Sequence, residues 1–255
     1  ASCLGVLVEH LPDGSKVLSQ PGLSKQLLTA MGMEDCNPTK TPMSGPLFPH
    51  SDSQPHNGSF NCRSALGVLM CLTNNARPEC AFAVNGCAQN SINPKHAHAE
   101  AVRRICRCIK GALDKGIIIR SPGSQMSLDC HVDADCAGTW TVTESTNPEV
   151  VKSRCGHVIT LGNVPVLWKS KRIQEICLST MESECISLSM AMRSLVHPRG
   201  LLFELDGIFP VGLGNKVSTM STVFEDNSAA LALATTDPPR MTPQSKSLSV
   251  KCHWF

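Results

Sequence analysis

Alternation of apolar and acidic residues at 128–135 is the feature that most limits what this chain can fold into. The apolar members are Leu128, Cys130, Val132 and Ala134, and the acidic members are Asp129, Asp133 and Asp135. A period of two places successive side chains on opposite faces of a β-strand. The segment therefore predicts a half-buried strand whose acidic side chains share one face.

Three further patterns predict the rest of a mixed sheet. Residues 156–161 and 164–170 favour a hairpin, because Gly162-Asn163 between them suits a tight two-residue turn. Ser179-Thr180-Met181-Glu182 has the sequence of a capping box, which opens a helix. A short strand at 222–224 and a helix at 228–234 follow. The predicted order is β-β-β-α-β-α, an α/β fold built on a mixed sheet.

The first half of the chain has a different, α+β pattern. Asp13-Gly14 predicts a hairpin turn, and the prolines and small polar residues of 36–60 predict a linker or surface loop. The expected strands are 4–8 and 17–19, and the expected helices are 21–32, 64–72, 78–89 and 94–113. We expect Asn93 to cap the last of these helices and Pro94 to begin it. The chain then divides into segments at 1–35, 36–60, 61–126 and 127–255.

Charge is distributed unevenly along the 255 residues. Lys and Arg number 23 and Asp and Glu 21, a net charge of +2 that alone suggests no nucleic-acid partner. Residues 1–127 hold 12 basic and 8 acidic side chains (+4), whereas residues 128–255 hold 11 and 13 (−2). One face of the 94–113 helix is apolar, and its other faces carry Arg103, Arg104, Arg107 and Lys110. These residues form either a solvated helix face or a surface that contacts phosphates.

Fourteen cysteines raise the question of disulfides or a zinc site. They are scattered, no CxxC pair occurs, and the closest two are Cys106 and Cys108. We therefore expect mostly buried free thiols and no disulfide or zinc framework. No apolar run reaches the ~18 residues of a membrane span, and the N-terminus lacks the order of a signal peptide. We expect an intracellular chain without membrane contact, in the cytoplasm or the nucleus.

Five short motifs occur in order along the chain. They are RPECAFAVN at 77–85, LDCHVDADCAG at 128–138, VLWKSK at 166–171, LSTMESE at 178–184 and EDNSAA at 225–230. Together they resemble motifs of the Pol polyproteins of copia-type long-terminal-repeat retrotransposons. The resemblance implies the end of a reverse transcriptase palm at 1–35, a helical thumb or connection segment at 61–126, and a ribonuclease H-like domain at 127–255.

The resemblance also implies a site and a reaction. Carried over by motif, the catalytic residues and metal ligands are Asp133, Glu184 and Asp226, which would hold two Mg²⁺ or Mn²⁺ ions. The family's reaction is hydrolysis of the RNA strand of an RNA–DNA hybrid. Candidate nucleic-acid contacts are Arg103, Arg104, Arg107, Lys110, Lys169 and Lys171.

The chain departs from the family in several places. It has no polymerase aspartate pair, so we expect no DNA synthesis. It stops at 252–255, before the final strand and helix that bear a fourth acid in relatives, and Ser247-Leu248-Ser249 replaces a motif with His and Asp. Pro198 interrupts a helical pattern, where we expect it to kink or end the helix. Positions that often hold Tyr in relatives carry Cys62, Cys71, Cys108, Cys185, Cys252, His131 and His157, which suggests mutational decay.

Three interpretations of function follow. The first is a metal-dependent ribonuclease H-type endonuclease, for which we expect little or no cleavage by this chain alone. The second is a non-catalytic remnant that binds nucleic acid through the basic helix. The third is a transposon-derived product without a role, which the sequence does not separate from the second.

Overall fold

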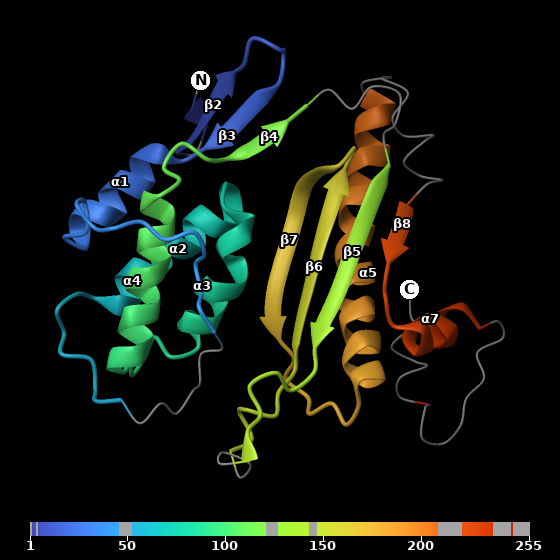
Figure 1. Cartoon of the computed structure of the whole chain (residues 1–255). Helices are drawn as coiled ribbons and strands as arrows, with labels where there is room; N and C mark the ends of the chain where they lie inside the picture. The colour runs from blue at the N-terminus through green and yellow to red at the C-terminus, as the bar shows by residue number, and fades with distance from the viewer. Residues whose placement is uncertain are drawn as a thin grey trace. The chain divides into compact units, whose positions relative to one another are not determined.

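The computed structural model describes residues 2–3, 5–45, 53–120, 127–142, 147–208, 221–236 and 246. The chain divides into two compact units, Ala1–Ser121 and Pro122–Phe255 (Figure 1). Both units combine helices with strands, so the expected α/β class is confirmed. Expectations for Ser247-Leu248-Ser249, Cys252 and the final strand and helix lie outside the described residues.

The N-terminal unit contains an antiparallel sheet in the order β1-β2-β3-β4. Its strands are β1 (Ser2–Cys3), β2 (Val6–His10), β3 (Lys16–Ser19) and β4 (Ile117–Ile119). The predicted hairpin is confirmed, with Gly14 at a φ of 82° and the Leu11 N–H donating to the Ser15 carbonyl at 2.8 Å. The sequence does not predict β4. Gly116 lies just before β4. A glycine is needed there because a Cβ would lie 2.1 Å from the Leu18 carbonyl oxygen.

The helices of the N-terminal unit pack around one hydrophobic core. They are α1 (Pro21–Ala30), α2 (Cys62–Asn75), the 3-10 turn η1 (Pro78–Cys80), α3 (Ala81–Ala88) and α4 (His96–Lys110). Leu69, Leu72, Val84, Ile105 and Ile109 form the centre of this core and are almost fully buried.

The start of α4 differs from the prediction. The helix begins at His96, so the expectation that Asn93 caps it and Pro94 begins it is wrong. Lys95 is the N-cap residue, and its N–H donates to Nδ1 of the buried His98 at 3.1 Å. This is the half of a capping box in which the side chain of the third helical residue accepts from the N–H of the cap residue.

The C-terminal unit contains a second sheet, in the order β7-β6-β5-β8 (Figure 1). Its strands are β5 (Leu128–Asp135), β6 (Arg154–Leu161), β7 (Val164–Arg172) and β8 (Ser221–Phe224). Strands β5, β6 and β7 are antiparallel, and β8 runs parallel to β5. Gly162 and Asn163 have φ of 55° and 66°, the conformation that a two-residue turn needs, so the predicted hairpin is confirmed.

Helix α5 (Thr180–Ile208) lies along one face of this sheet, and α7 (Ser228–Thr235) follows β8 (Figure 1). The observed order is the predicted β-β-β-α-β-α. The core between α5 and the sheet consists of Leu128, Cys130, Val132, Ile159, Leu188, Ala191 and Leu195. One half of the predicted capping box is present, because the Glu182 N–H donates to Ser179 Oγ at 3.1 Å, while the Glu182 carboxylate accepts from the Leu178 N–H at 2.8 Å.

Pro198 lies inside α5, which continues to Ile208, so of the two expected effects, a kink or an end of the helix, the second is excluded. The buried residues of α5 end at Leu195. Leu202, beyond the proline, still packs against the core of the sheet, so the backbone hydrogen bond that Pro198 removes lies within the part of the helix that packs on the sheet. Among the described residues, no helix combines the length and the apolar character that crossing a membrane requires.

Candidate metal centre

Three acidic side chains from separate elements meet at one end of the second sheet. Asp133 lies near the end of β5, Glu184 in the early turns of α5, and Asp226 two residues after β8. One carboxylate oxygen from each lies within 4.8 Å of the other two. The structure therefore brings together the three residues that the sequence motifs single out.

The local strand register explains this convergence. Strand β8 pairs with β5 as far as Phe224, opposite His131, and then leaves the sheet beside Asp133. Asn227 fixes the turn that follows, because its side chain accepts from the N–H groups of Ala229 and Ala230 and caps α7. On the other side, Ser187 Oγ of α5 donates to the Asp133 carbonyl at 2.9 Å.

Glu184 is the buried member of the site. It is 7% exposed, whereas Asp133 and Asp226 are exposed. Burial, followed by the negative charges of Glu225, Asp133 and Asp226, raises the pKa of Glu184 to about 7. Its Oε2 atom has no hydrogen-bond partner among the described residues. A buried carboxylate oxygen without a partner is costly, and a cation would supply the missing interaction.

Glu225 is a further acid that the sequence analysis missed. It is 8% exposed; its Oε1 accepts from the Asn227 N–H at 3.1 Å, and its Oε2 lacks a partner among the described residues. Burial and the charges of Asp226 and Asp133 raise the pKa of its carboxyl group. The adjacent Glu225-Asp226 pair at a strand end was the available signal, but only Asp226 matches the motif. Glu225 is not among the three acids whose oxygens meet within 4.8 Å.

This donor set fits a hard divalent cation. Mg²⁺ and Mn²⁺ prefer oxygen ligands, and the three converging groups are carboxylates. The unpartnered oxygen of Glu184 is an independent observation that favours such an ion. Asp133, Glu184 and Asp226 would hold it.

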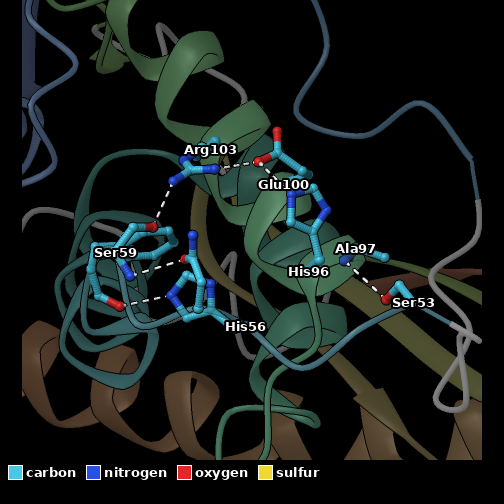
Figure 2. Close-up of polar contacts among 9 residues, drawn as sticks. Ser53, His56, Ser59, His96, Ala97, Glu100 and Arg103 are labelled. Carbon is cyan, nitrogen blue, oxygen red and sulfur yellow. Dashed lines mark hydrogen bonds and ion pairs between the residues drawn. The ribbon is translucent and has the colours of Figure 1, made fainter.

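The four basic residues of α4 lie in the N-terminal unit and have intramolecular partners. Figure 2 shows Arg103 donating to Ser59 Oγ at 2.8 Å and forming an ion pair with Glu100. The Arg103 guanidinium also lies 5.2 Å from the centroid of the Phe60 ring. The same region holds the chain before α4, because the Ala97 N–H donates to Ser53 Oγ at 3.2 Å (Figure 2).

The remaining basic side chains of α4 bind residues between Glu34 and Thr41, where the Pro-rich segment begins. Arg104 donates to Thr41 Oγ1 at 2.9 Å, Arg107 Nε donates to the Asn37 carbonyl at 2.6 Å, and Lys110 donates to the Glu34 carbonyl. The basic face of α4 therefore holds Glu34, Asn37, Thr41 and Ser59 against the helix, a structural role that the sequence did not indicate.

Lys169 and Lys171 lie on β7. Their register partners on β6 are the buried residues His157 and Cys155, so both lysines lie on the face of the sheet that α5 covers. They are not part of the acidic cluster.

Comparison with known proteins identifies the relatives of this chain. It is 29% identical over 255 residues to the retrovirus-related Pol polyprotein from transposon RE2 of Arabidopsis thaliana, a match that covers 99% of this chain and 16% of the relative. It is 27% identical over 253 residues to the corresponding polyprotein from transposon RE1 of the same plant, again over 99% of this chain and 16% of the relative. The polyprotein from transposon TNT 1-94 of Nicotiana tabacum is 28% identical over 245 residues, which cover 93% of this chain and 17% of the relative.

The chain thus spans only about a sixth of the length of these polyproteins. No protein-family model matches it, and no solved structure matches it significantly. The near-complete coverage by several transposon polyproteins nevertheless agrees with the ordered motifs of the sequence. The chain belongs to the Pol polyproteins of copia-type retrotransposons and is a fragment of such a protein.

Proposed function

We propose that the C-terminal unit is a ribonuclease H-like domain that hydrolyses the RNA strand of RNA–DNA hybrids with two Mg²⁺ or Mn²⁺ ions. The observation that carries this proposal is the convergence of Asp133, Glu184 and Asp226 within 4.8 Å, with one buried oxygen of Glu184 unpartnered. The motifs of the sequence and the transposon relatives support the same assignment.

The residues of the site have different roles. Bound divalent ions would supply a water of lowered pKa and would stabilise the leaving oxygen. The exposed Asp133 and Asp226 would be accessible to both ion and substrate, and the buried Glu184 would hold the ion from the protein side. The hydrogen bond from the Ala134 N–H to Glu184, and the bond from Ser187 to the Asp133 carbonyl, keep α5 and β5 in register. The acidic cluster repels phosphate unless a cation neutralises it, so substrate binding at the site depends on the metal.

The substrate follows from the chemistry of the two strands. Only the RNA strand offers a 2′-hydroxyl, which lets a protein distinguish it from DNA. The hybrid duplex is otherwise recognised through its phosphates and its shape.

The alternative, a non-catalytic remnant that binds nucleic acid through α4, is less well supported. Arg103, Arg104, Arg107 and Lys110 already donate to residues of the same unit. Phosphate contacts through them would have to displace these bonds. We therefore base the proposal on the acidic cluster.

Metal binding is the first test. We expect Mn²⁺ at a hundredfold excess over its dissociation constant to stabilise the chain by about 2.7 kcal/mol, measured as a rise in melting temperature. Asp133→Asn should abolish this rise. Asp129→Asn is the matched control, because Asp129 lies on the same face of β5 and its carboxylate accepts from Ser127 Oγ instead. An equal rise in the Asp133 variant would remove the basis of the metal centre.

Cleavage is the second test. A labelled RNA–DNA hybrid in single turnover with Mn²⁺ should be cut slowly, only in its RNA strand, by the wild type and by Asp129→Asn. Asp226→Asn should be inactive. A wild type that binds Mn²⁺ yet cuts no faster than Asp226→Asn would refute the nuclease and leave the metal centre standing.

A further inference from the structure

A second feature of the C-terminal unit is a groove of about 690 Å³ between β7 and α5. Its charged lining consists of Lys169, Lys171, Arg172, Glu175, Arg193 and His197. Its floor is the small apolar cluster that includes Ile173 and Ile186. No function described above uses this groove.

The strand side of the groove follows from the register of β7. Lys169 and Lys171 are two residues apart, so they lie on the same face of the strand, about 6.6 Å apart along it. Both are exposed, and neither ammonium group has a hydrogen bond or ion pair among the described residues. The strand therefore presents two unpaired positive charges to the groove.

The helix side adds one further cation, Arg193, and a histidine. Arg193 and His197 are four residues apart on α5, so they lie on one face of the helix and about 6 Å apart along its axis. Arg193 uses its Nε to donate to the Ser189 carbonyl at 3.3 Å, which leaves its other N–H groups for a ligand. His197 adds an imidazole ring to the same lining.

The positive charge of the groove is only partly offset locally. Arg172 forms an ion pair with Glu149 at 2.5 Å, and Glu175 is the one acid among the lining residues. The excess does not reflect a basic composition either, because residues 128–255 hold 11 basic and 13 acidic side chains, a net charge of −2. A net acidic half that gathers cations in one groove is suited to a polyanion.

We propose that this groove binds the phosphodiester backbone of a nucleic acid. Two lysines about 6.6 Å apart on the strand, with Arg193 across the groove, suit a chain of phosphates better than one isolated phosphate. The identity of the nucleic acid rests on the proposed function, because we take it to be the hybrid that the metal centre cuts. Arg193 and His197 join Lys169 and Lys171 as its contacts.

The position of the groove fits this role. Ser170, between the two lysines, lies in register with Gly156 and, through it, with Asp133. The backbone of the groove strand thus lies about 10 Å across the sheet from that of Asp133, two strand spacings away, with the two lysines on the α5 face and the Asp133 side chain on the other face. Because the acidic cluster repels phosphates, a separate basic contact would anchor the substrate close to it.

Salt-dependent binding tests the groove without catalysis. The affinity of a fluorescent RNA–DNA hybrid is measured by anisotropy in EDTA at 50 to 200 mM salt. The double variant Lys171→Gln/Arg193→Gln should bind at least tenfold more weakly and should reduce the slope of log affinity against log salt by about 1.8, near 0.9 for each lost contact. Lys25→Gln, which removes an exposed charge from α1, should leave both quantities unchanged. Urea unfolding confirms that the double variant is folded.

The outcomes separate this inference from the proposed function. Asp133→Asn should keep the wild-type salt slope, and the groove variant should keep the Mn²⁺-induced rise in melting temperature. If the groove variant keeps the hybrid affinity and the salt slope of the wild type, the proposal that the groove binds nucleic acid is wrong, whatever the cleavage assay shows. The last measurement is the binding of inorganic phosphate, with chloride at equal ionic strength as the reference. If phosphate binding is lost in the double variant while hybrid affinity is unchanged, the groove takes free phosphate and the proposal is wrong.

Discussion

His157 gives the sharpest prediction about stability. It lies on β6 opposite Val132, is 3% exposed, and neither of its ring nitrogens has a partner among the described residues. Burial, and secondarily the charge of Lys169, lowers its pKa from the ordinary 6.5 to about 4. The folded chain therefore holds a neutral imidazole that the unfolded chain would protonate below pH 6.5.

The sign of the pH effect follows from proton binding. Between pH 6.5 and 4 the unfolded state binds more protons than the folded state, so stability falls as the pH is lowered through this window. At pH 4.5 the loss attributable to His157 is about 2.5 kcal/mol relative to pH 8. The buried acids Glu184 and Glu225 act in the opposite direction, because their folded pKa values are raised. They are common to any pair of variants compared at His157, so their effect cancels in the difference.

The assay compares His157→Phe with the wild type by urea unfolding at pH 4.5, 6 and 8. We expect the variant to gain about 2.5 kcal/mol more over the wild type at pH 4.5 than at pH 8. His131→Phe is the control, because His131 is exposed on the opposite face of the sheet and stacks on Phe224. A stability difference between His157→Phe and wild type that is constant with pH would refute a neutral buried imidazole.

Three smaller predictions concern single residues elsewhere. Pro198→Ala should raise the free energy of unfolding by about 1 to 3 kcal/mol, because it restores a backbone donor inside α5; no gain in urea unfolding would contradict this. Gly116→Ala should destabilise the N-terminal unit by at least about 2 kcal/mol, since its Cβ would meet the Leu18 carbonyl at 2.1 Å, and hydrogen exchange should rise in β3 and β4. Glu225→Gln should stabilise the chain in EDTA by about 1 kcal/mol, because it removes a buried charge next to other acids, and a lower melting temperature would argue against that repulsion.

The elements that the sequence predicted are those with local determinants. The alternation in β5 depends on the chemistry of adjacent residues, and the Gly162-Asn163 turn depends on two residues that accept positive φ. The half of the capping box that forms likewise acts within one helical turn, from Ser179 to Glu182. Each pattern carries its own structural signal, so no knowledge of distant contacts is needed.

The elements that the sequence missed depend on distant contacts. Strand β4 exists because Ile117–Ile119 pair with Lys16–Leu18, about a hundred residues earlier. The role of Arg107 depends on a carbonyl 70 residues away, and a helix pattern shows only that such a side chain faces outward. Motif resemblance selected the three converging acids, whereas Glu225 required the structure, because only its burial distinguishes it from a surface acid.

In the C-terminal unit, the residues that conflict with local folding rules are His157 and Pro198, and both lie outside the acidic cluster. The three carboxylates of that cluster still converge. A domain is typically stable by about 5 to 15 kcal/mol. The unpartnered buried His157 and the proline inside α5 each lower the free energy of unfolding by a large fraction of that amount. A nuclease assay on this chain therefore reports the folded fraction as well as the chemistry. We expect His157→Phe/Pro198→Ala to cleave a hybrid faster than the wild type at 37 °C, with Asp226→Asn in the same background inactive. If the stabilised chain is fully folded, binds Mn²⁺ and still cuts no faster than its Asp226→Asn partner, the scaffold is not what limits it, and the site itself lacks a group that the reaction needs.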